Sequence, residues 1–313
     1  MAGNVGEGRR IDWFQPGRIA AMLLLALSVL APSCGFKALA GESIVDALGR
    51  TVAPGAATRI LALGSDVTEI VHALGAGERI IAVDRGSKYP PSVTGKPNVG
   101  YRRQLSVEGL AGLRPDLILA AEDSGPPEAL EVLKSLAFPI VFIPQDNSPQ
   151  GIERKIALIA ASLGLEKKGR TVSAEMLTAF QAAADLAARI PPERRRKVVF
   201  FHGLEKLSAA GAGTSADAII RYAGGLNPMD MVEGYKAASE EKLIEMAPDV
   251  ILMISDGKGG PTAEQVFGNR ALAATPAAAN RALIVLDGAY MIGFGPRTAD
   301  AIRDLAKALY PEG

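Results

Sequence analysis

Apolar runs alternate with helical patterns through the first half of the chain. Val67, Ile70, Val71 and Leu74 recur at helical spacing, and the pattern ends at Gly75. Further helices are predicted near 106–113 and over 126–137. Buried strands are predicted from four short apolar runs: "RILAL" (59–63), "RIIAVD" (79–84), "DLILAA" (116–121) and "PIVFIP" (139–144). Alternating strands and helices with short connections predict a largely parallel sheet covered by helices.

The pattern changes after Ser148 and then returns. Residues 151–190 are almost entirely helical in pattern, with a break near "LGLEKKG" (163–169). From "KVVFFHG" (197–203) the alternation resumes, with helices over 215–225 and near 239–246 and strands over 249–255 and 282–288. We therefore predict an α/β fold of two Rossmann-like lobes, each a mainly parallel sheet with flanking helices, joined by one long α-helix. The expected boundaries are 41–148, 149–192 for the helical connector, and 193–313.

The N-terminal residues predict an export signal. Arg9, Arg10 and Arg18 precede an apolar run (19–31) that is too short to span a membrane comfortably. We expect residues 1–40 to be a signal peptide cleaved after Ala40, and the product to be periplasmic. Lipidation at Cys34 is an alternative, although "APSC" is a poor lipobox, and the paired arginines leave both the Sec and Tat routes open.

Composition narrows the function classes. The 313 residues include 34 Lys+Arg and 34 Asp+Glu, so bulk charge gives no attraction to nucleic acid or to anionic membranes. The chain has 1 cysteine, which the predicted cleavage removes, so we expect neither disulfides nor thiolate sites. Hydrolase, P-loop and HExxH motifs are also absent, which disfavours an enzyme.

An internal repeat relates the two predicted lobes. "SVEGLAGLRPDLIL" (106–119) aligns without gaps to "SEEKLIEMAPDVIL" (239–252). Just upstream, "GYRRQLS" and "GYKAAS" match with one residue of slippage, which pairs Tyr101 with Tyr235. Helix–PD–strand junctions recur in many α/β folds, but the shared Gly–Tyr–basic segment favours a true repeat. Both loops would then lie at sheet edges, where open α/β sheets bind ligands.

With these motifs the chain resembles the periplasmic substrate-binding proteins of ABC importers whose lobes are joined by one long helix. This class III group includes cobalamin, ferric-siderophore and haem binders. The resemblance covers essentially 43–312, and "VGYRRQLSVEG" (99–109) and "GFGPRT" (293–298) favour its haem-binding members. It implies a monomer that binds haem as a transported ligand and passes it to a permease with its ATPase.

The resemblance implies that Tyr101 is an axial ligand of haem iron and that Arg103 supports it. A phenolate is a hard oxygen donor suited to ferric iron. Phenol is mostly protonated near neutral pH, since its reference pKa is about 10, and an adjacent guanidinium favours the ionised form. The alternative is a tyrosine packed in a loop beside two solvated arginines.

One histidine and two further tyrosines are also candidates for contact with haem. Some haem-binding members use a histidine of the second lobe opposite the tyrosine, and His202 follows the strand "VVFF" in that region. Tyr89 is a second candidate ligand or an aromatic wall for a porphyrin, and Tyr235 occupies the matching loop of the second lobe. His72 is expected to be structural, and one remaining histidine cannot build a histidine-rich zinc site.

Charged candidates complete the prediction. Arg102 and Arg297 could pair with haem propionates, as could Lys88 or Lys236, because arginine binds carboxylates in a bidentate manner; capping and surface pairing are the alternatives. The resemblance implies that Glu108 and Glu241 dock on permease arginines; otherwise they simply complement helix N-termini. The remaining function alternative is a ferric-siderophore or cobalamin receptor without a committed iron ligand. The long connector suggests a stiff hinge.

Overall fold

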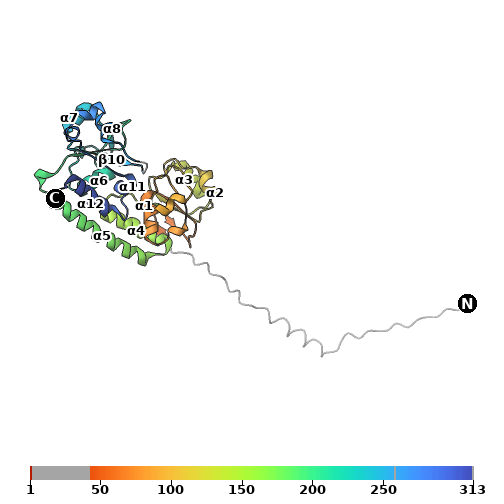
Figure 1. Ribbon diagram of the computed structural model, residues 1–313. Helices are drawn as coiled ribbons and strands as arrows, with labels where there is room; N and C mark the ends of the chain where they lie inside the picture. Colours follow the sequence, from red (N-terminus) through yellow and green to blue (C-terminus); the bar gives the residue numbers. More distant parts are fainter. Residues whose placement is uncertain (2–42, 257–258, 312–313) are drawn as a thin grey trace. The chain divides into compact units, whose positions relative to one another are not determined.

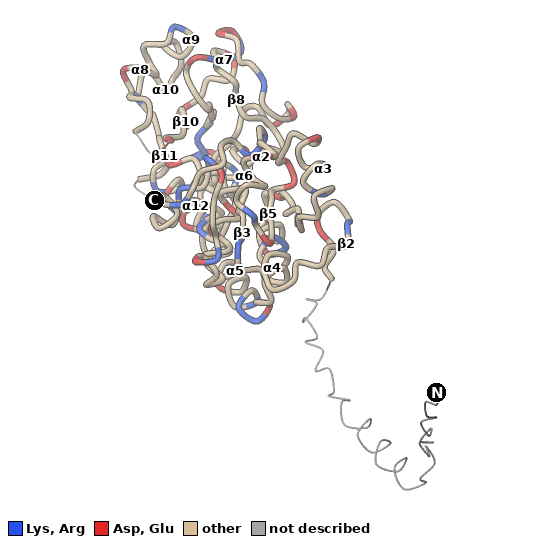
Figure 2. Tube along the Cα trace, turned by 90° about the vertical axis from the view of Figure 1, so that its right-hand side faces the viewer, with Lys and Arg blue, Asp and Glu red and all other residues tan. Residues whose placement is uncertain are grey.

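The computed structural model describes Met1 and residues 43–256 and 259–311 (Figure 1). Apart from Met1, the predicted signal peptide (1–40), with Cys34 and the cleavage point after Ala40, lies outside the described residues. Within them, no helix combines the length and apolar character needed to cross a membrane. Figure 2 shows basic and acidic residues interleaved along the described chain, in keeping with the equal totals of the two signs.

The first sheet has four parallel strands in the order β4-β3-β5-β6. Helices α1 and α4 cover one face and α2 and α3 the other, so the strands are buried almost throughout. The elements are β3 (Ile60–Leu63), α1 (Ser65–Ala73), β4 (Ile80–Val83), α2 (Val107–Gly112), β5 (Leu117–Ala121), α3 (Pro127–Ser135), β6 (Ile140–Ile143) and α4 (Pro149–Leu163). A hairpin of β1 (Ile44–Val45) and β2 (Thr51–Val52) precedes them.

The strand order creates a switch point in this sheet. Strand β3 pairs with β4 on one side and with β5 on the other. The chain therefore leaves β3 in one direction and later returns to its opposite side. In open α/β sheets, ligands bind beyond the carboxyl ends of the strands at such a point.

The second sheet has five strands in the order β11-β10-β7-β8-β9. β7 (Val198–Phe201), β10 (Val250–Ser255) and β11 (Leu283–Asp287) are parallel, as predicted. β8 (Ser208–Ala210) and β9 (Tyr235–Ala237) are antiparallel, and the sequence analysis did not predict them. Each has only three residues, too few for an apolar alternation to be recognised.

The helices of the second lobe divide between two cores. α6, α11 and α12 share the core that also contains α1, α4 and α5, whereas α7 to α10 cover the opposite face of the sheet. Their bounds are α6 (Ser215–Tyr222), α7 (Glu240–Met246), α8 (Ala263–Phe267), α9 (Arg270–Ala273), α10 (Pro276–Ala279), α11 (Gly288–Ile292) and α12 (Thr298–Leu309). In the described part of the chain, short 3₁₀ helices lie at Gly77–Arg79, Pro91–Gly95 and Pro192–Arg194.

The segment predicted as the helical connector forms two helices, with the break near the predicted place. α4 ends at Gly164, whose φ of 66° is left-handed and favours glycine, and α5 (Glu166–Ala188) follows. Because α5 packs on α4 and on α12, one hydrophobic core runs through both lobes and the connector (Figure 1). The fold class is therefore as predicted, and the boundaries at 148 and 192 stay predictions.

The internal repeat is visible in matching local structure. Ser106 caps α2 by accepting from the Gly109 amide, and Ser239 caps α7 in the same way from the Lys242 amide. Both copies then place a non-glycine residue at positive φ immediately before the proline: Arg114 at 49° and Ala247 at 43°. A shared unfavourable conformation at equivalent positions is a stronger sign of a repeat than a common capping residue.

Candidate functional site

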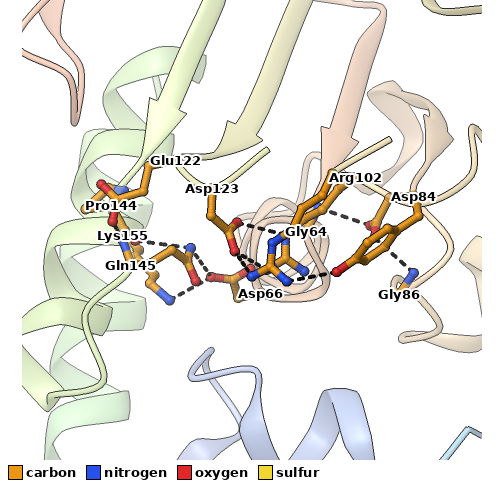
Figure 3. Close-up of polar contacts among 12 residues, drawn as sticks. Gly64, Asp66, Asp84, Gly86, Arg102, Glu122, Asp123, Pro144, Gln145 and Lys155 are labelled. Carbon is orange, nitrogen blue, oxygen red and sulfur yellow. Dashed lines mark hydrogen bonds and ion pairs between the residues drawn. The ribbon is translucent and has the colours of Figure 1, made fainter. Parts of the chain in front are cut away.

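Polar side chains gather at the carboxyl edge of the first sheet, beside its switch point. Figure 3 shows the strand ends directed toward Asp66, Arg102 and Asp123. Asp66 follows β3, Asp123 follows β5, and Arg102 comes from the loop after β4. This edge is where a ligand is expected in an open parallel sheet.

The loop after β4 folds back along the end of its own strand. The Val99 amide donates to the Val83 carbonyl at 2.9 Å, and the Arg85 amide donates to the Gly100 carbonyl at 2.8 Å. Gly100 has a φ of 87°, a conformation that favours glycine at this turn. The result is that Tyr101 lies directly beside the end of β4.

Tyr101 belongs to a continuous charged network. Its phenol oxygen accepts a hydrogen bond from Arg103 Nη1 at 2.8 Å. The other terminal nitrogen of Arg103 donates to the Asp123 carboxylate. Arg102 binds the same carboxylate in a bidentate manner, through Nε at 2.9 Å and Nη2 at 2.7 Å. Asp123 thus holds both arginines, and one of them holds the phenol oxygen.

The protonation states in this network are fixed by mutual pairing. Burial alone would raise the pKa of Asp123, but the hydrogen bonds and charges of Arg102 and Arg103 outweigh it and lower that pKa. Burial would likewise lower the pKa of both guanidinium groups, and Asp123 instead raises it. A carboxylate and two cations therefore persist beside Tyr101 across the physiological pH range.

The second lobe presents an aromatic group at its corresponding edge. His202 follows β7 directly, and its ring centroid lies 4.9 Å from that of Tyr235 and 5.0 Å from that of Phe200. His202 is exposed at its surface. Burial of the rest of its ring, together with the charge of Arg103, lowers the pKa of the imidazole. Burial raises the pKa of Tyr235, against the opposing effects of a Ser215 hydrogen bond and Arg103. Arg103 thus acts electrostatically on both rings of the second lobe.

Tyr89 stacks on an arginine that is itself firmly held. The Arg297 guanidinium lies 3.5 Å from the Tyr89 ring centroid and binds Glu69 in a bidentate manner, through Nε at 3.0 Å and Nη2 at 2.5 Å. Burial raises the pKa of Glu69, although Arg297 opposes the shift. Tyr89 is 42% exposed, so much of its ring remains available for contact.

The other charged candidates lie elsewhere. Glu108 and Glu241 are exposed in the first turns of α2 and α7, outside the network of Tyr101. Lys88 donates to the carbonyl oxygen of Asp256, and Lys236 is exposed on β9. The structure therefore brings Tyr101 and Arg103 into direct contact and joins Arg102 to them through Asp123, with His202 and Tyr235 within the electrostatic reach of Arg103.

Sequence analysis missed the acidic partners of this site. Asp123 stands two residues beyond β5, and that position at a strand end was a usable signal. Asp66, three residues beyond β3, carried the same signal. It is buried with Lys155 of α4 at 2.7 Å, next to Gln145 (Figure 3). Glu69, the partner of Arg297, is 6% exposed and was not among the residues predicted for the site.

The sequence family agrees with this architecture. The model of a family described as "Periplasmic binding protein" matches residues 60–290. The chain belongs to this family. The assignment rests on a match over most of the chain and does not depend on any single site residue.

Solved structures and curated proteins of related description are similar to this binding protein in sequence or fold. The periplasmic haem-binding protein RhuT from Roseiflexus sp. RS-1, in apo form, is 36% identical with a TM-score of 0.76, over 81% of this chain and 98% of that one. The periplasmic haem-binding protein HutB of Vibrio cholerae is 34% identical with a TM-score of 0.72, over 81% and 99%. A vitamin B12-binding protein of Pectobacterium atrosepticum is 27% identical over 201 residues, 62% of this chain and 71% of that one.

Proposed function

We propose that this protein is a periplasmic substrate-binding protein that binds haem between its two lobes and delivers it to an ABC permease for haem and iron uptake. The observation that carries the proposal is the Tyr101 phenol oxygen, held by Arg103 at 2.8 Å at the carboxyl edge of the first sheet. Similarity to the haem-binding proteins RhuT and HutB supports haem as the ligand.

Tyr101 supplies its phenolate oxygen to ferric haem iron. The Arg103 guanidinium stabilises the phenolate, because a charge-assisted hydrogen bond to the ionised form favours it. Asp123 keeps Arg103 in place through its other terminal nitrogen. The phenol oxygen is thereby positioned before the ligand arrives, which lowers the ordering cost of binding.

His202 is the second axial ligand in this proposal. Its lowered pKa keeps the imidazole neutral near pH 7, so that a nitrogen lone pair is available to iron. Tyr89 and Tyr235 provide aromatic surfaces for the porphyrin. Arg102 and Arg297 already bind Asp123 and Glu69 through Nε and Nη2, so a propionate at either guanidinium must share it with that carboxylate or displace it.

Delivery of haem to the permease uses an exposed, acidic surface. Glu108 and Glu241, one on each copy of the repeat, dock on arginines of the permease, whose ATPase drives uptake. Their exposure in equivalent first turns supports a paired role. The protein acts as a monomer, is exported by its signal peptide with cleavage after Ala40, and carries haem as cargo without catalysing a reaction.

The second candidate is a cobalamin or ferric-siderophore receptor, which the similarity to a vitamin B12-binding protein favours. Haem is preferred because cobalamin and siderophores need no phenol ligand from the protein, whereas here a guanidinium donates to the phenol oxygen of Tyr101. Absorbance titrations of the mature protein with haemin, cyanocobalamin and a ferric hydroxamate distinguish the candidates. Saturable binding of haemin alone supports haem transport, and tight binding of either other ligand without a haemin response contradicts it.

A further inference from the structure

Two of the arginines near the proposed haem site are already bound to carboxylates of this chain. Arg102 holds Asp123, and Arg297 holds the buried Glu69, each in a bidentate manner. Displacing Arg297 leaves Glu69 without its cation, and displacing Arg102 leaves Asp123 with Arg103 alone, so either exchange has a cost that opposes the gain from the ligand. A further guanidinium, that of Arg85, lies at the same edge.

The backbone of Arg85 is fixed on both sides. Its own amide donates to the Gly100 carbonyl. The preceding residue, Asp84, is 1% exposed and accepts from the amides of Gly64 at 3.0 Å and Gly86 at 2.9 Å (Figure 3). Because this turn ties the end of β4 to the loop before α1, the base of the Arg85 side chain has a defined position.

The side chain of Arg85 is less constrained than its backbone. It is exposed, and its guanidinium lies 5.2 Å from the centroid of the Tyr101 ring. Among the residues that the structure describes, no carboxylate forms an ion pair with it. A cation over the face of the ring lies to the side of the phenol oxygen.

We propose that Arg85 binds a carboxylate of the ligand, a haem propionate, and so contributes to recognition of acidic tetrapyrroles. This inference rests on the proposed function. Arg85 has donors to spare, since its contact with Tyr101 is through the ring face. Its guanidinium can therefore stay over Tyr101 while it donates two hydrogen bonds to a propionate.

The test compares Arg85→Gln with wild type for two ligands, haemin and haemin dimethyl ester, whose propionates carry no charge. We expect Arg85→Gln to weaken haemin binding about three- to tenfold and to leave the ester within about twofold, the range for one partly exposed charged pair. Arg85→Lys should recover part of the loss, and added salt should narrow the difference between wild type and Arg85→Gln.

The matched control is Arg170→Gln on α5, exposed and remote from this edge, which should bind both ligands as wild type does. Equal haemin affinity in wild type and Arg85→Gln, or an equal loss for haemin and its ester, overturns the inference while leaving haem binding intact. Failure of the wild type to bind haemin overturns the proposed function itself.

Discussion

At the scale of single residues, the site depends on the hydrogen bonds and ion pairs that join Tyr101, Arg102, Arg103 and Asp123. The pairing of Tyr101 with Arg103 follows from the spacing of two residues in one loop, which sequence reasoning could use. Asp123 is 20 positions from Arg103 and meets it only because the loop after β4 folds over the end of β5. No local pattern encodes that contact, and the same holds for Glu69 and Arg297, 228 positions apart.

Arg103→Gln tests the role of the guanidinium at Tyr101. Without the cation the iron-bound phenolate is less favoured, so acid displaces the tyrosinate from iron at higher pH. We expect the midpoint for loss of the tyrosinate band to rise by about one pH unit, the equivalent of one charge-assisted hydrogen bond.

Absorbance spectra of the haemin complex between pH 4 and 9 measure this midpoint, with Arg170→Gln as the control. An unchanged or lowered midpoint in Arg103→Gln would show that the guanidinium does not stabilise the phenolate.

At the scale of elements, hydrophobic periodicity predicted every parallel strand and the long helices, because burial on both faces leaves continuous apolar runs. It missed β8 and β9, whose three residues each pair only through backbone bonds at the sheet edge. The internal repeat predicted the same helix-to-strand junction in both lobes. There Asp116 accepts from the Arg59 amide at 2.7 Å, as Asp249 accepts from the Lys197 amide at 2.8 Å.

Asp116→Asn tests this junction. The Asp116 carboxylate also accepts from the amide and hydroxyl of Thr58, both at 2.8 Å. Although burial opposes the shift, these bonds lower its pKa. A lowered folded-state pKa stabilises the protein above the unfolded value, near 3.9, and this contribution is lost as pH falls through the folded pKa.

We therefore expect Asp116→Asn to cost about 1–2 kcal/mol of unfolding free energy at pH 7, and the cost to shrink as pH falls below about 4. Urea unfolding at both pH values measures it, beside Asp230→Asn, an exposed control. A cost that does not depend on pH would rule out the carboxylate charge as its source.

At the scale of the whole molecule, a buried ion pair lies where both lobes meet the connector. Lys155 of α4 is 0% exposed; its ammonium binds Asp66 of the first lobe at 2.7 Å and the Phe294 carbonyl of the second at 3.3 Å. With the Glu69–Arg297 pair, it joins α1 to the segment before α12. These links accord with the stiff hinge that the long connector suggests.

Lys155→Met should destabilise the protein by about 3–5 kcal/mol, because it leaves a buried carboxylate without its partner. Adding Asp66→Asn should recover part of this loss, so the two substitutions should be less than additive. Urea unfolding of the single and double variants gives the coupling, with Lys167→Met on the exposed face of α5 as a control. Strict additivity would mean that the pair does not act as a unit.

Tyr101 is proposed to bind haem iron, and the visible spectrum of the haemin complex reports that bond. Tyr101→Phe removes only the phenol oxygen, and Tyr222→Phe, whose ring packs on Phe180 at 4.8 Å, is the matched control. We predict a ferric tyrosinate spectrum for wild type and Tyr222→Phe, and its loss or a clear shift in Tyr101→Phe. An identical spectrum in wild type and Tyr101→Phe would contradict the assignment of Tyr101 as the iron ligand.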